Sequence, residues 1–105
     1  CAVVASAAAG VSPYLVHNGE NGFLYDCRNQ DSLNRKVKKL ILDEKLRLEF
    51  AGRGYQTVHD FWNPGNAVSS FLALTDSILH KKENPIKQGP CSPALVIKDG
   101  WFRDE

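Results

Sequence analysis

The sequence predicts an α/β fold with a parallel sheet, and three observations carry this prediction. Two short apolar runs, residues 2–5 and residues 23–25, have the composition of buried strands. The segment between them, residues 10–22, contains a short helical pattern and can supply the crossover that parallel strands need. Longer helical patterns fill the chain up to residue 79. This order of strand, helix, strand and helices is typical of α/β domains.

The first strand is followed by a loop of small residues, namely Ser6, Ala7, Ala8, Ala9 and Gly10. In open α/β sheets ligands bind beyond the carboxyl ends of the strands, so this loop is a candidate binding loop. Small side chains let a ligand approach the backbone, and the N–H groups around Gly10 to Pro13 are predicted to lie near a helix N-terminus, which favours phosphate. Small residues after a strand also serve helix–sheet packing, and the loop matches neither a dinucleotide-binding nor a Walker pattern.

The stretch VHNGENGFLY, residues 16–25, contains two Asn-Gly pairs directly before the second apolar run. Ser12 and Pro13 predict the start of a short helix that Asn18 and Gly19 would end. Residues 20–22 then form a turn into the second strand, residues 23–25. A β-hairpin is the alternative, because Asn-Gly between apolar runs is a hairpin signal. The helical segment between the two runs favours the crossover. Two strands rarely form a stable sheet alone, so further strands are expected, either before Cys1 or from another copy.

Three helices are predicted after the second strand, and each begins at a capping residue. Asp31 is the predicted N-cap of the first helix, Asp43 that of the second and Asn63, with Pro64 after it, that of the third. Gly52 and Gly54 interrupt the second helix, where they either permit close packing or weaken it. The apolar positions of the three helices are Leu33, Val37, Leu40 and Ile41; Leu46, Phe50, Tyr55 and Val58; and Ala67, Val68, Phe71, Leu72, Thr75, Ile78 and Leu79.

The C-terminal segment is divided into a polar part and an apolar part. Residues 81–89 are rich in turn formers, whereas residues 91–105 include the apolar run 94–97, Trp101 and Phe102. We therefore expect residues 81–105 to be a tail that packs on the domain formed by residues 1–80. The chain contains no Met and begins inside an apolar run, which indicates a parent protein that extends before Cys1.

The charge balance argues against a nucleic-acid partner, since 13 basic and 12 acidic side chains leave a net charge of +1. The lysine groups 36, 38–39 and 81–82 are predicted to be solvated helix surface. The three cysteines, at positions 1, 27 and 91, are widely spaced, which favours reduced thiols over disulfides or a metal site. No run reaches membrane-spanning length, and a cytoplasmic protein is expected, with peripheral membrane attachment as the alternative.

No catalytic constellation is visible in the sequence. The acidic candidates are Asp26, Asp31 and the pair at 43–44; capping explains Asp31 and Asp43, and Asp26 has no evident partner. Trp62 stands between two helices, where an inter-element anchor is favoured over stacking on a sugar. We therefore assign no catalytic residue, no metal and no cofactor.

The ordered segments resemble the C-terminal end of family 4 glycosyltransferases, within the glycosyl transferases group 1. The resemblance is carried by AVVASAAAGVSPYLVHNGENGFLY, by DSLNRKVKKLILDEKLRLEFAGRGYQTVHDFW and by AVSSFLAL, and it covers residues 2–79. In this family a PVVAS strand precedes a Gly-rich loop and a short helix. An NG-x-L strand and an Asp-opened helix follow, and a further helix runs from D-x-x-x-R to a Trp. The matching structural positions here are Asn21, Gly22, Leu24, Asp31 and Trp62.

The resemblance implies a GT-B fold, of which this chain would be half of the Rossmann-like C-terminal domain. That domain binds a nucleotide-sugar donor, and sugar transfer to a saccharide or lipid-linked acceptor retains the anomeric configuration, generally without a metal. Residues 6–10 would then flank the donor pocket. The family's paired glutamates would lie before Cys1, and Ala9-Gly10 replaces the usual Gly-Gly. The fragment alone is therefore expected to transfer no sugar and to bind donor weakly or not at all.

Two hypotheses follow from the sequence. The first is a piece of a retaining glycosyltransferase, and the second is a non-enzymatic helical interaction module with apolar faces that bind a partner. An upstream reading frame that ends in the glutamate pair would favour the first. Because half a sheet exposes an edge and an apolar face, self-association of the fragment is also expected.

Overall fold

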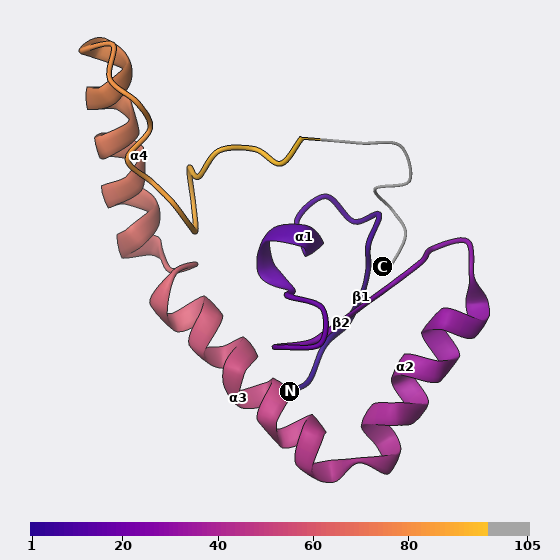
Figure 1. The fold of residues 1–105 in the computed structure, drawn as a ribbon. Helices are drawn as coiled ribbons and strands as arrows, with labels where there is room; N and C mark the ends of the chain where they lie inside the picture. The colour runs from indigo at the N-terminus through magenta and orange to yellow at the C-terminus, as the bar shows by residue number, and fades with distance from the viewer. Residues whose placement is uncertain (97–105) are drawn as a thin grey trace. The chain divides into compact units, whose positions relative to one another are not determined.

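The computed structural model describes residues 1–96 and contains two short strands and four helices. In chain order these are β1 (Val4–Ser6), α1 (Ser12–Leu15), β2 (Phe23–Tyr25), α2 (Gln30–Leu42), α3 (Glu44–Asp60) and α4 (Pro64–Leu79) (Figure 1). The described residues form two compact units, Cys1–Thr57 and Val58–Val96, so the second unit begins within the last turn of α3. The predicted packing of the apolar residues 97–105, which include Trp101 and Phe102, lies outside the described residues.

The two strands of the first unit pair in parallel, as the sequence predicted. Val4 lies opposite Phe23 and Ser6 opposite Tyr25 in the register. The Phe23 N–H donates to the Val3 carbonyl at 2.9 Å. The second strand has the predicted bounds, whereas the first begins two residues later than predicted and includes Ser6. Parallel strands joined through α1 and followed by helices give the architecture of half a Rossmann-like α/β domain.

The outer edge of β2 is closed by side chains of the chain itself. The backbone N–H and carbonyl groups alternate in direction along a strand. Those of Phe23 and Tyr25 point toward β1, so those of Leu24 point away from it. The Leu24 N–H donates to Asn18 Oδ1 at 2.9 Å, and the Leu24 carbonyl accepts from Lys36 Nζ. No backbone group of Leu24 therefore remains for a further strand.

The core of the first unit lies where α2 and α3 meet the sheet, and its largest member is Phe50. This side chain is 1% exposed and meets the Phe23 ring edge-on, with 4.9 Å between the ring centroids. Leu40 from α2 completes the buried cluster, and Ala2, Val4 and Leu46 pack against it. The predicted apolar faces of α2 and α3 are buried only in part. Ile41, at 66% exposed, and Tyr55, at 68% exposed, lie at the surface.

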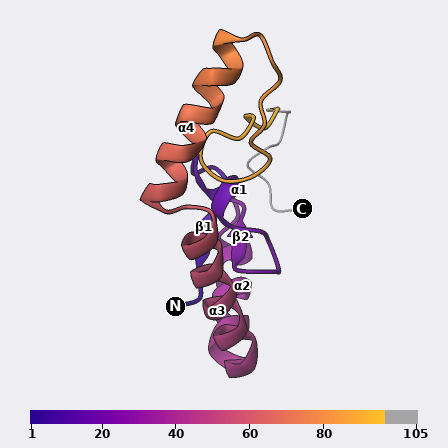
Figure 2. The same cartoon turned by 90° about the vertical axis from the view of Figure 1, so that its left-hand side faces the viewer.

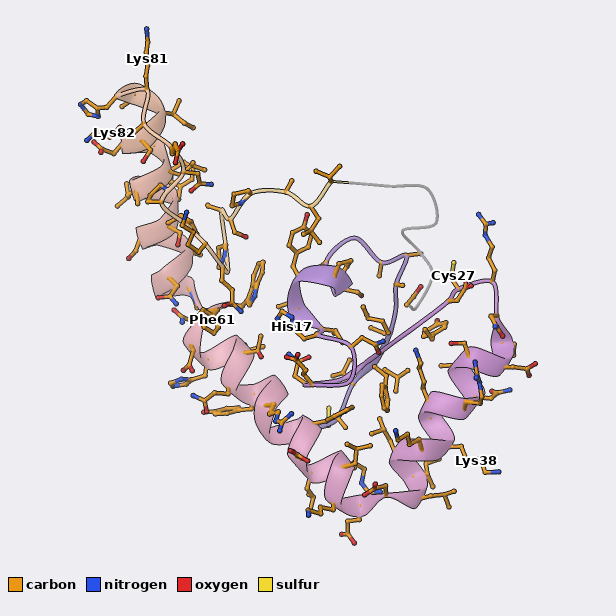
Figure 3. The ribbon with its side chains drawn as sticks, viewed as in Figure 1. His17, Cys27, Lys38, Phe61, Lys81 and Lys82 are labelled. Carbon is orange, nitrogen blue, oxygen red and sulfur yellow. The ribbon has the colours of Figure 1, made fainter. Side chains whose placement is uncertain are left out.

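Two of the lysines predicted to be solvated have ammonium groups near the core: Lys36 is partly buried, whereas Lys39 is exposed, as predicted. The Nζ atoms of Lys36 and Lys39 lie 6.0 Å and 5.5 Å from the centroid of the Phe23 ring. An ammonium group over an aromatic face is attracted by the ring quadrupole, so both lysines help to cover Phe23. Lys38 and Lys81, in contrast, point away from the ribbon, as expected for surface lysines (Figure 3).

The crossover between the strands differs from the prediction at both ends of α1. Val11, not Ser12, is the N-cap, and it has helical backbone angles and no capping side chain. Ser12 is already inside the helix and is 5% exposed. The helix ends at Leu15, because Val16 turns to an extended conformation, so Asn18 does not end it. Gly19 has φ of 86°, a left-handed conformation that suits glycine, and lies in the turn that leads to β2.

The start of α2, the first helix after the sheet, differs from the prediction. Asn29, not Asp31, caps α2, because the Asn29 backbone is extended and its side chain accepts from the Ser32 N–H at 3.1 Å. Asp31 lies in the first turn, where its carboxylate interacts favourably with the positive end of the helix dipole. The other two predicted starts are supported by hydrogen bonds. Asp43 Oδ1 accepts from the Leu46 N–H at the start of α3, and Asn63 is the N-cap of α4.

The corner between α2 and α3 is fixed by both ends of the D-x-x-x-R motif, residues 43–47. While Asp43 caps α3, the Arg47 guanidinium donates to the Leu40 carbonyl at 2.9 Å and to the Ile41 carbonyl at 3.3 Å. These carbonyls belong to the last turn of α2, where helices leave acceptors unsatisfied. The motif therefore begins one helix and caps the end of the other.

In the second unit the chain runs back alongside α4 after the helix ends (Figures 1 and 2). The returning segment is held by Asn84, whose side chain donates to the Cys91 carbonyl at 2.9 Å, and by Gly89, which is buried against the Phe61 backbone. Ser77 is the buried residue of α4. Five bulky apolar side chains of this helix are 61–74% exposed, namely Val68, Phe71, Leu72, Ile78 and Leu79, whereas Leu74 is partly buried.

Candidate functional site

The small-residue loop turns sharply at the carboxyl end of β1. The Ser6 hydroxyl accepts from the Ala8 N–H at 3.2 Å, and the Ser6 carbonyl accepts from the Ala9 N–H at 3.1 Å. Ala7 is buried, and its N–H donates to the Tyr25 carbonyl at 2.9 Å. The first half of the loop is therefore tied to the sheet, and this bond extends the β1–β2 pairing by one residue.

The second half of the loop is exposed, and its backbone is accessible. Ala9 and Gly10 lie at the surface, and a Cβ atom built on Gly10 would meet no atom within 4 Å. Among residues 1–96, the N–H groups of Gly10 and Val11 have no hydrogen-bond partner, whereas the Ser12 N–H donates to the Ala9 carbonyl at 2.9 Å. The predicted run of N–H groups at residues 10–13 is thus reduced to two, because Ser12 is engaged and Pro13 has none.

The end of β2 lies beside the start of this loop. Tyr25 is opposite Ser6 in the register, and Asp26 and Cys27 follow it directly. Asp26 Oδ1 accepts from the Arg28 N–H at 2.9 Å, which gives this carboxylate a local turn-forming role. Cys27, labelled in Figure 3, is an exposed free thiol, and Cys1 and Cys91 are also free. Within residues 1–96 no group of three or more His, Cys, Asp or Glu side chains could hold a metal ion.

Asn21 is the hydrogen-bonding centre that fixes the turn before β2. This side chain is 6% exposed. Its Oδ1 accepts from the His17 N–H at 2.7 Å, and its Nδ2 donates to the Leu15 carbonyl at 3.0 Å and to Thr57 Oγ1 at 2.9 Å. Thr57 belongs to α3, so one amide side chain connects the end of α1, the turn and the third helix. A second link is the Arg53 guanidinium, which donates to the Glu20 carbonyl at 3.2 Å.

Replacing Asn21 with alanine is expected to lower the free energy of unfolding by about 1–3 kcal/mol, because buried partners lose their hydrogen bonds. Urea unfolding followed by circular dichroism measures this change. Asn34→Ala is the matched control, since Asn34 is exposed on α2 and its side chain accepts from the neighbouring Gln30 side chain. Equal effects of the two substitutions would show that Asn21 does not hold the turn.

Trp62 lies in the second unit, between α3 and α4. Its side chain is partly buried, and the indole Nε1 is a buried atom without a hydrogen-bond partner among the described residues. Its backbone N–H donates to the Val58 carbonyl at 3.1 Å, which continues the α3 pattern by one residue. Partial burial agrees with an anchoring role, which remains a prediction.

A comparison with known protein families places the site in context. The family model of the glycosyl transferases group 1 matches residues 1–57, more than half of the 105 residues. The chain belongs to the group 1 glycosyl transferases. The searches of curated proteins and of solved structures gave no match.

The family match in this group 1 glycosyl transferase ends at Thr57, where the first compact unit also ends. It contains the small-residue loop, both strands, α2 and the Asn21 network. Trp62 and α4 lie beyond the match, so their part in the resemblance remains a prediction. None of the helices described in residues 1–96 has the length and apolar character needed to cross a membrane.

Proposed function

We propose that the chain is the donor-side part of a retaining glycosyltransferase with a GT-B fold. In the parent enzyme, a sugar would pass from a nucleotide-sugar donor to a saccharide or lipid-linked acceptor. Residues 6–10 would flank the donor pocket. The observation that carries this proposal is the position of the loop, at the carboxyl ends of two parallel strands in a chain of this family. Ligands of open α/β sheets bind at that edge.

The loop has two properties that suit a phosphate-bearing ligand. The exposed N–H groups of Gly10 and Val11 can donate to phosphate oxygens, and the space beside Gly10 lets the ligand reach the backbone. The Ser6 hydroxyl accepts the Ala8 N–H and can turn its hydrogen toward a ligand oxygen. These groups are assigned hydrogen-bonding roles and no catalytic one, so the proposed role of the loop is binding, and the chain alone is expected to transfer no sugar.

A ligand-observed NMR experiment tests the role of the loop. The chain is mixed with UDP-, GDP- and ADP-sugars, and saturation transfer to the nucleotide is expected for one of them, with a Kd on the order of 1 mM. Gly10→Val places a side chain in the space beside the loop, where its Cβ meets no atom within 4 Å, and it is expected to lower the signal at least about tenfold.

The matched control for this experiment is Gly52→Val. Gly52 is exposed on α3, and its Cβ would also meet nothing within 4 Å, so this variant should bind donor like the original chain. Unchanged saturation transfer in Gly10→Val would contradict the proposal. Tight donor binding measured by calorimetry would contradict the expectation that the chain holds only part of the donor site.

A further inference from the structure

The two Asn-Gly pairs before β2 have the same local sequence chemistry and different surroundings. Asn18 and Gly19 are both exposed, and Gly19 has the left-handed φ of 86°. Asn21 is 6% exposed, and Gly22 after it is buried as well. The turn therefore presents one Asn-Gly pair to solvent and keeps the other inside the first unit.

An Asn-Gly pair can react within itself, with water as the only other reactant. The glycine nitrogen attacks Cγ of the asparagine and forms a bond to it. The bond between Cγ and Nδ2 breaks, and Nδ2 leaves as ammonia together with the proton of the glycine N–H. Glycine favours this ring closure because it has no Cβ to crowd the ring. Water then opens the cyclic imide at either carbonyl, which gives aspartate or isoaspartate.

The hydrogen bonds of the turn protect the two pairs unequally. Ring closure at Asn21 requires its buried amide to release three bonds, which hold it to the turn, to the end of α1 and to α3. Ring closure at Asn18 requires the release of bonds at the surface. Asn18 Oδ1 accepts from the Leu24 N–H at 2.9 Å, and the Gly19 N–H donates to the Gly22 carbonyl at 2.8 Å. Exposed turns open locally at lower cost than buried networks, so Asn18 is the more reactive position.

We infer that Asn18 is a site of spontaneous deamidation and that the fold protects Asn21. The reaction acts on the edge of β2, because Asn18 Oδ1 is the acceptor for the Leu24 N–H. Aspartate keeps an oxygen at this place. Isoaspartate instead carries the main chain through Cβ and Cγ, which lengthens the turn and removes that acceptor. Either product also places a carboxylate in residues 1–19, which contain no Asp, Glu, Lys or Arg. This inference does not depend on the proposed donor binding.

Peptide mapping by mass spectrometry tests the site after incubation of the whole chain in mildly alkaline buffer. Cleavage after Glu20 puts the two Asn-Gly pairs into different peptides. Asn18 should deamidate at least about tenfold faster than Asn21 in the folded chain, and the two rates should agree within about threefold in urea. Asn34, which is exposed and followed by Arg35, is the control for exposure without glycine and should react at least about tenfold more slowly than Asn18. Equal rates at the two pairs in the folded chain, or a rate at Asn18 no higher than at Asn34, would overturn the inference.

Amide hydrogen exchange tests the consequence for β2. In the isoaspartate form, separated by ion exchange, the Leu24 amide should exchange at least about tenfold faster than in the original chain. Asn18→Asp is the matched variant, because it carries the same charge and keeps an acceptor oxygen, so its Leu24 amide should exchange at the original rate. The Phe23 amide, which donates to the Val3 carbonyl, is the internal control. Unchanged exchange at Leu24 in the isoaspartate form, or equal acceleration at Phe23, would contradict a local opening of the β2 edge.

Discussion

Replacing Phe50 with alanine is expected to lower the free energy of unfolding of the first unit by about 3–5 kcal/mol. The phenyl ring is 1% exposed and is the largest fully buried side chain among the described residues. It is also the edge-on partner of Phe23 at 4.9 Å, so its removal leaves a cavity under the sheet. Small units have stabilities of this size in total, and the variant should be largely unfolded at 25 °C.

Urea unfolding monitored by far-ultraviolet circular dichroism measures this effect. Leu48→Ala is the matched control, because Leu48 lies on the same helix but is 64% exposed, and its truncation should change stability by less than about 0.5 kcal/mol. A loss below about 1 kcal/mol for Phe50→Ala would show that the packing of Phe23, Leu40 and Phe50 does not stabilise the unit.

Replacing Gly22 with alanine is expected to destabilise the same unit by about 1–3 kcal/mol, the usual cost of overpacking. An added Cβ would lie 2.9 Å from Val16 Cγ1 and 2.9 Å from the Val3 carbonyl oxygen. That oxygen accepts the Phe23 N–H, so relief of the contact would strain the first bond between the strands. Gly22 therefore allows the turn to pass close behind β1.

Gly52→Ala is the matched control for Gly22→Ala in the same thermal or urea unfolding experiment. Its Cβ would meet no atom, and alanine in a helix interior is favoured over glycine, so stability should rise by about 0.5–1 kcal/mol. Opposite signs for the two substitutions are the expected result. A stabilising Gly22→Ala would show that the turn does not approach the strand as closely as described.

Much of the fold was predictable because it depends on local patterns. The apolar residues 23–25 form β2 with the predicted bounds, and the crossover of residues 10–22 makes the strands parallel. Asn63 caps α4 as predicted. Residue type alone does not separate Asp31, the predicted N-cap of α2, from Asn29, the observed one, because both residue types are good caps. The extended backbone at Asn29, which follows the turn after β2, decides between them.

The missed features depend on contacts between distant parts of the chain. Lys36 has the sequence context of a solvated helix lysine, and only the fold brings its ammonium group to the Leu24 carbonyl. Asn21 was expected as a turn residue, and its bond to Thr57 joins positions 36 residues apart. Periodicity likewise predicted an apolar face on α3, but the side chain of Tyr55 lies at the surface because the small sheet covers only part of that helix.

The place of the candidate loop in the fold was predictable, and its available hydrogen-bonding groups were less so; its role in donor binding stays a prediction. The small residues after the first apolar run predicted a loop at the carboxyl end of a strand, and the loop lies there. The predicted phosphate-binding N–H groups of residues 10–13 were reduced in number by the Ser12 bond to Ala9. The Ser12 N–H is engaged because α1 begins one residue earlier than predicted, with Val11 and not Ser12 as its N-cap.

Backbone chemical-shift mapping tests the central claim most directly. The ¹⁵N-labelled chain is titrated with the nucleotide sugar that gives saturation transfer, up to concentrations on the order of 10 mM. The largest amide shifts are expected at Ala9, Gly10 and Val11, with smaller shifts at Ser6 and Asp26. Shifts centred on α4 or on the exposed face of α3, with the loop amides unchanged, would contradict it.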